Sequence, residues 1–300
     1  MKRTTGEKAF DIFNSGLLGF CGLITLFPFW NIIVTSFVGR EEYYARNLIL
    51  WPFKFDLSAY FYIFSTAWIS SGFKVSILVT VCGTIYTMLL VCMAAFALNK
   101  KTLPGRKFFT TYFLITMYFS GGLVPYFLVV TKFLSMGDSL LALIITNGLN
   151  VWGFLVLRTF FKEIPDSLPE SASLDGANDI QILFRIFLPL SLPALATLTL
   201  FTSVSFWNEW SRALYFINDD FKQPLQIILR RMVIDLNSSI TQRSIMDKMY
   251  QQLVGGTDKT IFDLAVKSAT VSVVTVPILC VYPFLQKYFA KGVLIGSVKG

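Results

Sequence analysis

Residues 163–179 read EIPDSLPESASLDGAND, a polar and turn-rich segment between two long apolar runs. Pro165 and Asp166 are typical of a helix start, because proline is tolerated in the first turn of a helix. The pair Asp175-Gly176 predicts a break, because glycine adopts a positive φ without steric cost. The segment is therefore expected to hold a short helix that ends in a tight turn.

A second helix is expected after this turn, with Asn178 or Asp179 as its cap. It would run into the next apolar segment through Ile180, Leu183, Phe184 and Phe187. One face of the bend would carry only small side chains, so that another protein could approach its backbone closely. These residues are Ser171, Ala172, Ser173 and Ala177. An ordinary loop between membrane helices is the alternative interpretation.

The composition indicates that much of the chain lies in a membrane. Hydrophobic residues make up 54% of its 300 positions and charged residues 15%, whereas soluble domains average about a quarter charged residues. The net charge of +8 does not indicate nucleic-acid binding, because the basic residues lie in short flanks between apolar runs. Charge in such flanks is better explained by membrane topology.

Two residue types restrict the possible chemistry. The chain has no histidine, which removes the commonest general base and metal ligand and excludes Ser-His and Cys-His catalysis. The four cysteines lie inside apolar runs without C-x-x-C spacing, so neither a metal site nor a disulfide framework is expected. We interpret them as small packing residues; they are Cys21, Cys82, Cys92 and Cys280.

The apolar runs predict an all-α membrane protein with six transmembrane helices in a single domain over residues 1–300. The predicted spans are residues 12–38, 72–98, 108–130, 140–161, 186–206 and 263–284. The third run contains Gly121, Gly122 and Pro125, so a kink or an unwound stretch is expected there.

The polar segments indicate the orientation of the chain. Residues 99–107 read NKKTLPGRK, a short and strongly basic sequence that is typical of a cytoplasmic loop. Both termini also carry basic residues, so the N-terminus and a tail over residues 285–300 are predicted to be cytoplasmic. Alternation then places residues 163–185 in the cytoplasm and residues 207–262 outside.

The pattern Glu170-x-Ala172-x-x-Asp175-Gly176-Ala177 continues with Phe184, Ile186, Leu188-Pro189 and Pro193. It resembles the cytoplasmic EAA loop of ABC-importer permease subunits, and departs from it at Ser171, where the family usually has alanine. The resemblance implies the transmembrane fold of a type I ABC importer. Within that family the chain looks similar to carbohydrate permeases of the maltose-transporter type, and most of all to those for complex oligosaccharides of the aldouronate or alginate-oligosaccharide type.

In that family the loop is a coupling helix that docks in a cleft of the cytoplasmic ATPase. The resemblance therefore implies that a group of residues couples this chain to an ATPase: Glu170, Ser171, Ala172, Leu174, Asp175, Gly176 and Ala177. Glu170 would contact a basic residue of the ATPase, and Gly176 would permit the bend.

The end of the chain is also similar to carbohydrate-importer permeases of the maltose type. In the maltose system the tail reaches between the two ATPase subunits, which implies ATPase contacts for Gly296, Ser297, Val298, Lys299 and Gly300. An external loop of that system reaches into the sugar-binding protein. Residues 207–262 occupy the equivalent place, although this match is one of position alone.

Polar side chains in or beside the spans are candidates for the substrate path, because amides and aromatic rings suit the hydroxyls and ring faces of a sugar. The candidates are Tyr118, Asn147, Asn150, Asn208 and Glu209. Interhelical hydrogen bonding or anchoring at the membrane interface is the alternative role. In the maltose system the paired permease supplies the sugar site.

The resemblance implies a permease subunit of an ATP-driven, binding-protein-dependent importer that moves a sugar or an oligosaccharide into the cell. The expected partners are a second and different permease, two ATPase subunits, an extracytoplasmic solute-binding protein and membrane lipid. The chain has no GxxxxGK[ST] phosphate loop, so no enzyme activity and no bound cofactor are expected; ATP and magnesium would bind to the ATPase subunits. The implied location is the bacterial cytoplasmic membrane, with several passes.

Two other classes of protein remain as alternatives. A proton- or ion-coupled secondary transporter or channel subunit would place ionisable residues in the middle of its spans and often shows inverted repeats. Neither feature is evident in the sequence. A membrane-embedded enzyme would need a metal-ligand cluster or a nucleophile with its base, and the sequence contains no recognisable arrangement of either kind.

Overall fold

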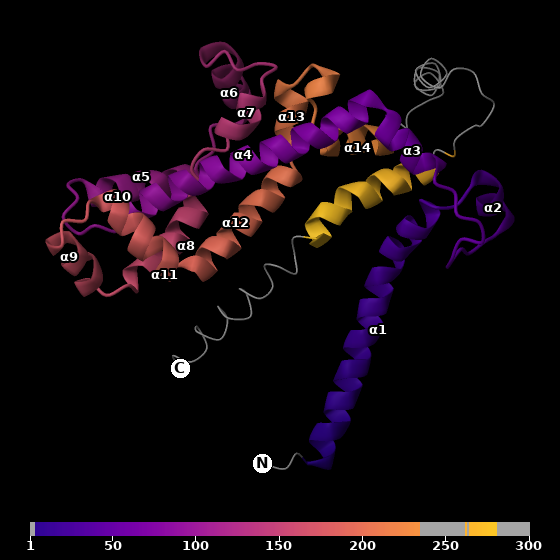
Figure 1. Ribbon diagram of the computed structural model, residues 1–300, viewed down its shortest axis with the longest axis horizontal. Coiled ribbons are helices and arrows are strands. Elements are labelled where there is room, and N and C mark those ends of the chain that lie inside the picture. The colour runs from indigo at the N-terminus through magenta and orange to yellow at the C-terminus, as the bar shows by residue number, and fades with distance from the viewer. Residues whose placement is uncertain (1–3, 235–261, 263, 281–300) are drawn as a thin grey trace. The chain divides into compact units, whose positions relative to one another are not determined.

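The computed structural model describes residues 4–234, 262 and 264–280 (Figure 1). These residues form helices and the segments that join them. No strand occurs in those residues, in agreement with the all-α prediction. In chain order the helices are α1 (Thr5–Thr35), α2 (Arg40–Ala45), α3 (Ser58–Ser65), α4 (Ala67–Ala97), α5 (Arg106–Tyr118), α6 (Leu123–Leu128), η1 (Val129–Phe133), α7 (Leu140–Ile145), α8 (Val151–Lys162), α9 (Ser167–Leu174), α10 (Asp179–Ile182), η2 (Leu183–Phe187), α11 (Leu188–Leu190), α12 (Leu192–Trp207), α13 (Ser211–Phe216), η3 (Asp220–Lys222) and α14 (Leu225–Ile234), followed by a helix over Leu264–Cys280.

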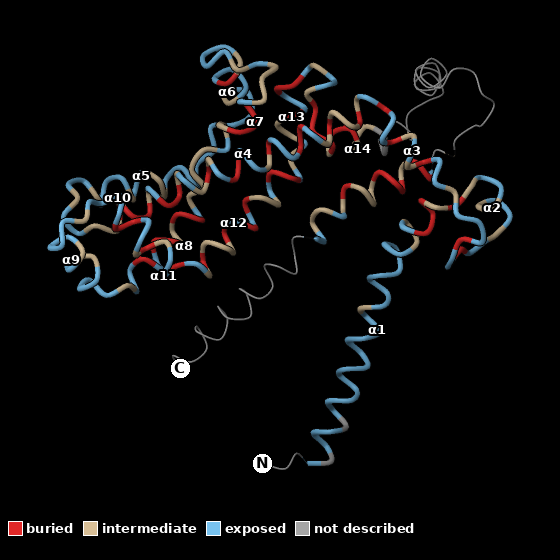
Figure 2. Tube along the Cα trace, in the orientation of Figure 1, coloured by how far each residue is buried: buried red, intermediate tan, exposed pale blue. Residues whose placement is uncertain are grey.

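The described residues divide into two compact units. The first unit holds the chain up to Ser70 and the described residues from Arg231 to Val276. The second unit holds Ser71–Arg230 and the described residues after Val276. Buried residues are frequent along the helices of the second unit and rare along α1 (Figure 2). The segment at residues 163–179 lies entirely in the second unit.

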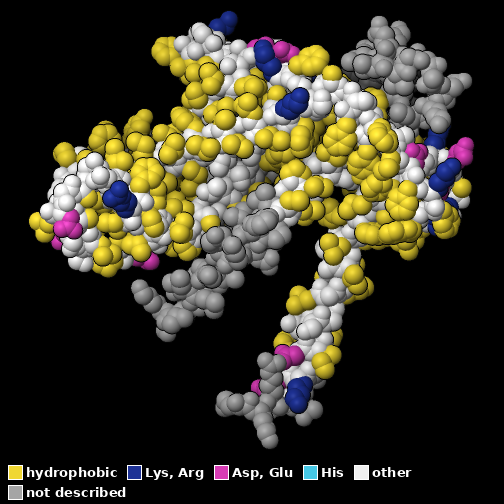
Figure 3. Space-filling model, in the orientation of Figure 1, with side chains coloured by type: hydrophobic (Ala, Val, Ile, Leu, Met, Phe, Trp, Pro, Cys, Tyr) yellow, Lys and Arg dark blue, Asp and Glu magenta, His cyan; other side chains and the backbone are white. Residues whose placement is uncertain are grey.

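The helix α1 is long and apolar, and most of its side chains are exposed. A capping box begins it: the Glu7 N–H donates to the Thr4 hydroxyl at 3.4 Å, and Glu7 Oε2 accepts from the Thr4 N–H at 2.8 Å. Only 6% of its most apolar window is buried, and hydrophobic side chains occur along the length of its visible surface (Figure 3). Apolar exposure over this length is the pattern of a lipid-facing helix.

Some of the six predicted spans are continuous helices and others are broken. Gly6–Thr35 and Ala67–Ala97 are each long and apolar enough to cross a membrane alone, and they correspond to the first two predicted spans. Two bent helix pairs would add two further spans if each pair counts as one. The helix Leu264–Cys280 falls in the predicted span 263–284, whose last part lies outside the described residues. The described residues thus contain two to four candidate spans by this criterion, and the number six remains a prediction.

The expected break in the third span is confirmed. α5 ends at Tyr118, and the next helical stretch, Leu123–Phe133, is turned by 113° from it. Gly122 lies at the junction with a φ of +83°, a conformation that residues with a Cβ adopt only at a cost. Gly122 therefore lets the chain change direction sharply at this point.

The structure differs from the predicted continuous helix over residues 140–161. α7 ends at Ile145 and α8 begins at Val151, with Gly148 between them at a φ of +53°. The Asn150 side chain accepts the Gly153 N–H at 3.0 Å and so starts a new helix. A left-handed glycine followed by an N-cap interrupts the apolar run, although its composition suits a membrane throughout.

The predicted span 186–206 also differs from a straight helix. The stretch Asp179–Leu190 meets Leu192–Trp207 at an angle of 88°. Pro189 and Pro193 flank the bend at Ser191, and each proline lacks the N–H that would continue the backbone ladder. The helix after the bend, α12, covers most of the predicted span.

Helices occupy the beginning of the predicted external segment 207–262. α13, η3 and α14 follow the end of α12 in quick succession. Residues 235–261 lie outside the described residues, as does the predicted tail 285–300.

The core of the second unit joins α4, α8, η2 and α12. Its buried apolar side chains include Val91, Phe96, Phe154, Leu157, Phe161, Leu183, Phe187 and Leu198. Gly83 permits a close approach of α4 to α12, because a Cβ at this position would lie 2.4 Å from the Phe206 ring. These packed helices form the support behind the segment at residues 163–179.

Candidate functional site

The segment between α8 and α10 folds into a short helix that is closed by a tight turn. α9 ends at Leu174, and Gly176 follows with a φ of +86°. The Ala177 N–H donates to the Ala172 carbonyl at 2.9 Å, and the Gly176 N–H donates to the Ser173 carbonyl at 3.1 Å. These two bonds define a Schellman motif, in which a left-handed glycine ends a helix. The predicted break at Gly176 is thus confirmed.

The second short helix begins with a capping box. Asn178 Oδ1 accepts the Gln181 N–H at 2.9 Å, and Gln181 Oε1 accepts the Asn178 N–H at 2.9 Å. Of the two predicted caps, Asn178 is the N-cap and Asp179 is the first helical residue. α10 then continues into the π-helical stretch η2 without a break. The unit formed by α9, the turn and α10 is called the coupling knuckle below.

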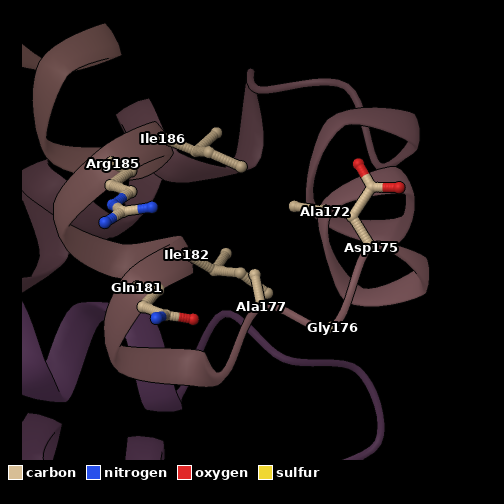
Figure 4. Close-up of a pocket in the computed structure, with 8 residues that line it drawn as sticks. All are labelled: Ala172, Asp175, Gly176, Ala177, Gln181, Ile182, Arg185 and Ile186. Carbon is tan, nitrogen blue, oxygen red and sulfur yellow. The ribbon is translucent and has the colours of Figure 1, made fainter.

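A cleft of about 470 Å³ lies between the two helices of the coupling knuckle (Figure 4). It is lined by Ala172, Asp175, Gly176, Ala177, Gln181, Ile182, Arg185 and Ile186. Ala172 points from α9 toward the helix formed by α10 and η2. Ala172 and Ala177 are half-buried and pack against the apolar core. Both alanines therefore face the interior of the knuckle, whereas Ser171 and Ser173 remain exposed.

The outer side of the knuckle combines apolar and acidic side chains. Leu174 is 90% exposed at the end of α9, and Glu170 is exposed one turn earlier. Leu168, Ile180 and Phe184 are further exposed hydrophobic residues of the same segment. An exposed leucine next to a carboxylate can make an apolar contact and an ionic contact with the same partner protein.

Two adjacent lysines brace the knuckle at both of its helix starts. Lys101 Nζ lies 2.6 Å from Asp166 Oδ2 at the N-cap of α9. Lys100 Nζ pairs with Asp179 Oδ1 at the first residue of α10. Both pairs are partly exposed to solvent, so each contributes only about 0.5 kcal/mol to stability. Each pair joins the start of one short helix to the loop between α4 and α5.

The proposed substrate-path residues do not form one cluster of free polar groups. Tyr118 is 77% exposed at the end of α5, and Asn147 is exposed in the turn after α7. Asn150 caps α8, and Asn208 Oδ1 accepts from Gln226 Nε2 at 3.2 Å. These four side chains thus lie at helix ends or in a turn, or take part in local hydrogen bonds. Their substrate contacts remain a prediction.

Glu209 is engaged within the protein. Its Oε2 accepts from Arg212 Nε at 2.6 Å, and its Oε1 accepts the Arg212 backbone N–H at 2.8 Å. Both side chains are about nine-tenths buried, with 10% and 11% exposure. The carboxylate therefore holds the junction between α12 and α13, in line with the alternative role in helix packing.

The five predicted tail residues, Gly296 to Gly300, lie outside the described residues. Within the described part of the chain no group of acidic residues or cysteines is arranged to hold a metal ion. The bracing lysines were not among the residues predicted from the sequence for the site. Their signal in the sequence was the basic loop 99–107, which indicates a cytoplasmic location but not a partner for each charge.

Comparison with known proteins assigns the family. The family model described as "Binding-protein-dependent transport system inner membrane component" matches residues 23–295. The chain belongs to this family. It is the permease subunit of a binding-protein-dependent ABC importer, as the resemblance of its sequence indicated.

Individual relatives match along their whole length. The polygalacturonan/rhamnogalacturonan transport system permease protein YtcP of Bacillus subtilis (strain 168) is 43% identical, over 98% of this chain and 99% of its own. Protein LplC of the same organism is 39% identical, over 100% and 98% of the two chains. A chain in the crystal structure of a bacterial ABC transporter that imports the acidic polysaccharide alginate is similar in fold, with a TM-score of 0.85, 29% identity and coverage of 96% and 99%.

Proposed function

We propose that this permease moves an acidic oligosaccharide into the cell. YtcP is named for polygalacturonan and rhamnogalacturonan, and the transporter of similar structure imports alginate, an acidic polysaccharide. These polymers share uronic acid units, so the relatives point to one chemical class of substrate. Full-length similarity to both proteins supports the transfer of this class to the present chain.

The coupling knuckle is the contact through which an ATPase drives this transport. The observation that carries this assignment is the Schellman closure of α9, which presents Glu170 and Leu174 on a rigid and exposed tip. The knuckle continues directly through η2 into the helices of the core. A push on its tip is thereby carried to the membrane helices. The tail at Gly296 to Gly300 supplies a second ATPase contact in this proposal.

The complete importer contains a second permease, two ATPase subunits that bind ATP and magnesium, and an external solute-binding protein. A relative of similar fold has been solved with a periplasmic protein that carries an alginate pentasaccharide, at a TM-score of 0.57. We place the chain in the cytoplasmic membrane with six spans and both termini inside. The spans are α1, α4, the bent pair within Arg106–Phe133, α7 together with α8, α12, and the helix that begins at Leu264.

A pull-down of the tagged full chain from native membranes in mild detergent tests the assembly. We expect recovery of an ATPase and a second permease, identified by mass spectrometry. The variant Glu170→Arg/Leu174→Asp should lose the ATPase and keep the permease, because both substitutions lie on the exposed tip. Recovery of the chain alone, with uptake that needs no ATP, would instead support a secondary transporter.

Uptake by the purified complex in proteoliposomes tests the substrate class. We expect transport of oligogalacturonides or alginate oligosaccharides in the presence of the binding protein. Neutral oligosaccharides of equal length should be transported at least about tenfold less well, since a site built for charged groups rejects analogues that leave them unpaired. Equal uptake of acidic and neutral oligosaccharides would remove the assignment to acidic substrates and leave the permease function intact.

A further inference from the structure

Arg158 is a buried arginine whose hydrogen-bonding capacity is only partly used. It lies on α8 with 8% of its surface exposed, and its Nε has no acceptor. Its Nη1 donates to Thr110 Oγ1 at 3.2 Å, and that hydroxyl in turn donates to the Arg106 carbonyl at 2.8 Å. The Phe154 ring lies 5.9 Å from the guanidinium carbon. A buried guanidinium with these partners lacks the anion that would balance its charge.

Arg106 adds a second positive charge near Arg158, and this charge also lacks a balancing anion among the described residues. Arg106 lies one helical turn before Thr110 on α5, and its carbonyl accepts from the hydroxyl that Arg158 contacts. Among the described residues, no carboxylate forms an ion pair with either arginine. Two like charges at the contact between α5 and α8 repel each other. An anion placed between them would remove that repulsion.

A cleft of about 420 Å³ lies beside Arg106. Arg106 and Lys162 line it, and Lys162 follows Arg158 by one helical turn, so the two share a face of α8. Glu163 and Asp166 are the acidic residues of the cleft, and Lys101 already pairs with Asp166. The cations without an acidic partner therefore outnumber the free carboxylates.

We propose that Arg158 and Arg106 bind a phosphate group at the contact between α5 and α8. The planar fork of arginine matches phosphate oxygens, and Nε with one Nη is the edge that binds them in a bidentate manner. In the proposed topology, the start of α5 and the end of α8 lie at the cytoplasmic surface of the membrane. Basic pockets between membrane helices on that side bind anionic lipid headgroups. The phosphate can therefore come from an anionic lipid or from free phosphate.

Binding to the full-length chain in nanodiscs tests this site. One arm compares phosphatidylcholine discs with discs that also contain phosphatidylglycerol, and the other adds inorganic phosphate to phosphatidylcholine discs. We expect phosphatidylglycerol to raise the unfolding temperature of the wild type. Arg158→Gln and Arg106→Gln should each weaken its apparent affinity about tenfold, because each removes a charge-assisted contact. Lys107→Gln is the matched control, since Lys107 is exposed and next to Arg106.

Several outcomes decide the proposal. A response to phosphatidylglycerol that both arginine variants lose, but Lys107→Gln keeps, assigns the site to a lipid headgroup. A response to inorganic phosphate alone, with the same pattern in the variants, assigns it to free phosphate. Equal behaviour in all discs and phosphate solutions, or a response that both arginine variants retain, overturns the proposal. Arg106→Gln keeps the test valid if Arg158→Gln does not fold, because Arg106 is only half-buried. None of these readouts depends on transport, so failure here leaves the proposed function untouched.

Discussion

Glu209 and Arg212 form an ion pair that fastens three helices together. The pair joins the end of α12 to α13, and Arg212 Nη1 also donates to the Leu143 carbonyl of α7 at 3.1 Å. Both side chains are about nine-tenths buried. Removal of one partner would leave a buried charge without compensation, which is the costly case for an ion pair.

We predict that Glu209→Ala lowers the free energy of unfolding by about 3 kcal/mol. Chemical denaturation of the purified chain in detergent measures this change. The double variant Glu209→Ala/Arg212→Met should recover part of the loss, because it leaves no unpaired charge. Unchanged stability together with a raised KM for substrate would instead give Glu209 a role in the substrate path.

Substitutions at Gly176 should act through the backbone and not through steric contact. A Cβ at this position meets nothing within 4 Å, but the φ of +86° is strained for residues other than glycine. We expect Gly176→Ala to cost about 1 kcal/mol locally and to reduce the transport obtained per ATP hydrolysed. Gly176→Asn should retain more coupling, because asparagine tolerates this conformation better.

Reconstituted complexes with measured ATPase and uptake rates provide the test for Gly176. Gly121→Ala is a suitable comparison, because Gly121 also has open space around its Cα and lies outside the knuckle. Normal coupling in Gly176→Val would show that the Schellman closure is not needed for transport.

The brace between Lys100 and Asp179 should influence coupling more than stability. We predict that Lys100→Glu changes the free energy of unfolding by less than about 1 kcal/mol, because the pair is partly exposed. Transport per ATP should fall, since α10 loses the contact that fixes its start. The charge-reversed double variant Lys100→Glu/Asp179→Lys should restore it. Lys107→Glu makes the same change of charge in an exposed position and should have little effect on transport per ATP. An equal loss of transport per ATP in Lys107→Glu and Lys100→Glu would contradict a specific role of the Lys100–Asp179 pair.

We predict that Asp138 makes the stability of the second unit dependent on pH. Its carboxylate accepts the backbone N–H groups of Asp219 and Asn218, each at 3.0 Å, and pairs with Lys222. The Asp219 N–H is the largest influence that holds the pKa of Asp138 below its ordinary value, followed by Lys222. The same carboxylate raises the pKa of Lys222.

The directions of these shifts set the pH range of the effect. A lowered carboxyl pKa stabilises the fold above the unfolded value of about 3.9 and loses this effect as the pH falls through the folded pKa. The raised pKa of Lys222 gives a contribution that is present below about pH 10.4 and is lost as the pH rises further. Asp138→Asn should therefore be less stable than the wild type near neutral pH. Unfolding curves at decreasing pH should converge for the two proteins, and a constant difference in acid would contradict this account.

The turn at Gly176 and the cap at Asn178 were predicted from the sequence because their signals are local. Gly176 requires a left-handed turn, and Asn178 can bond the amide three residues later; neither effect depends on distant parts of the chain. The break near Gly122 was predicted for the same reason. The split at Gly148 was not predicted, because a single glycine within an apolar run is also compatible with an uninterrupted membrane helix.

The sequence by itself determined the all-helical class, the membrane character and the position of the knuckle, because each of these follows from local composition. The tertiary structure alone decided which distant side chains meet: Lys100 with Asp179, Lys101 with Asp166, and Arg158 with Thr110 of a different helix. The physical reason is distance in sequence. A capping bond or a turn joins residues that are a few positions apart, whereas the α5–α8 contact and the brace between residues 100 and 179 exist only after the helices have packed.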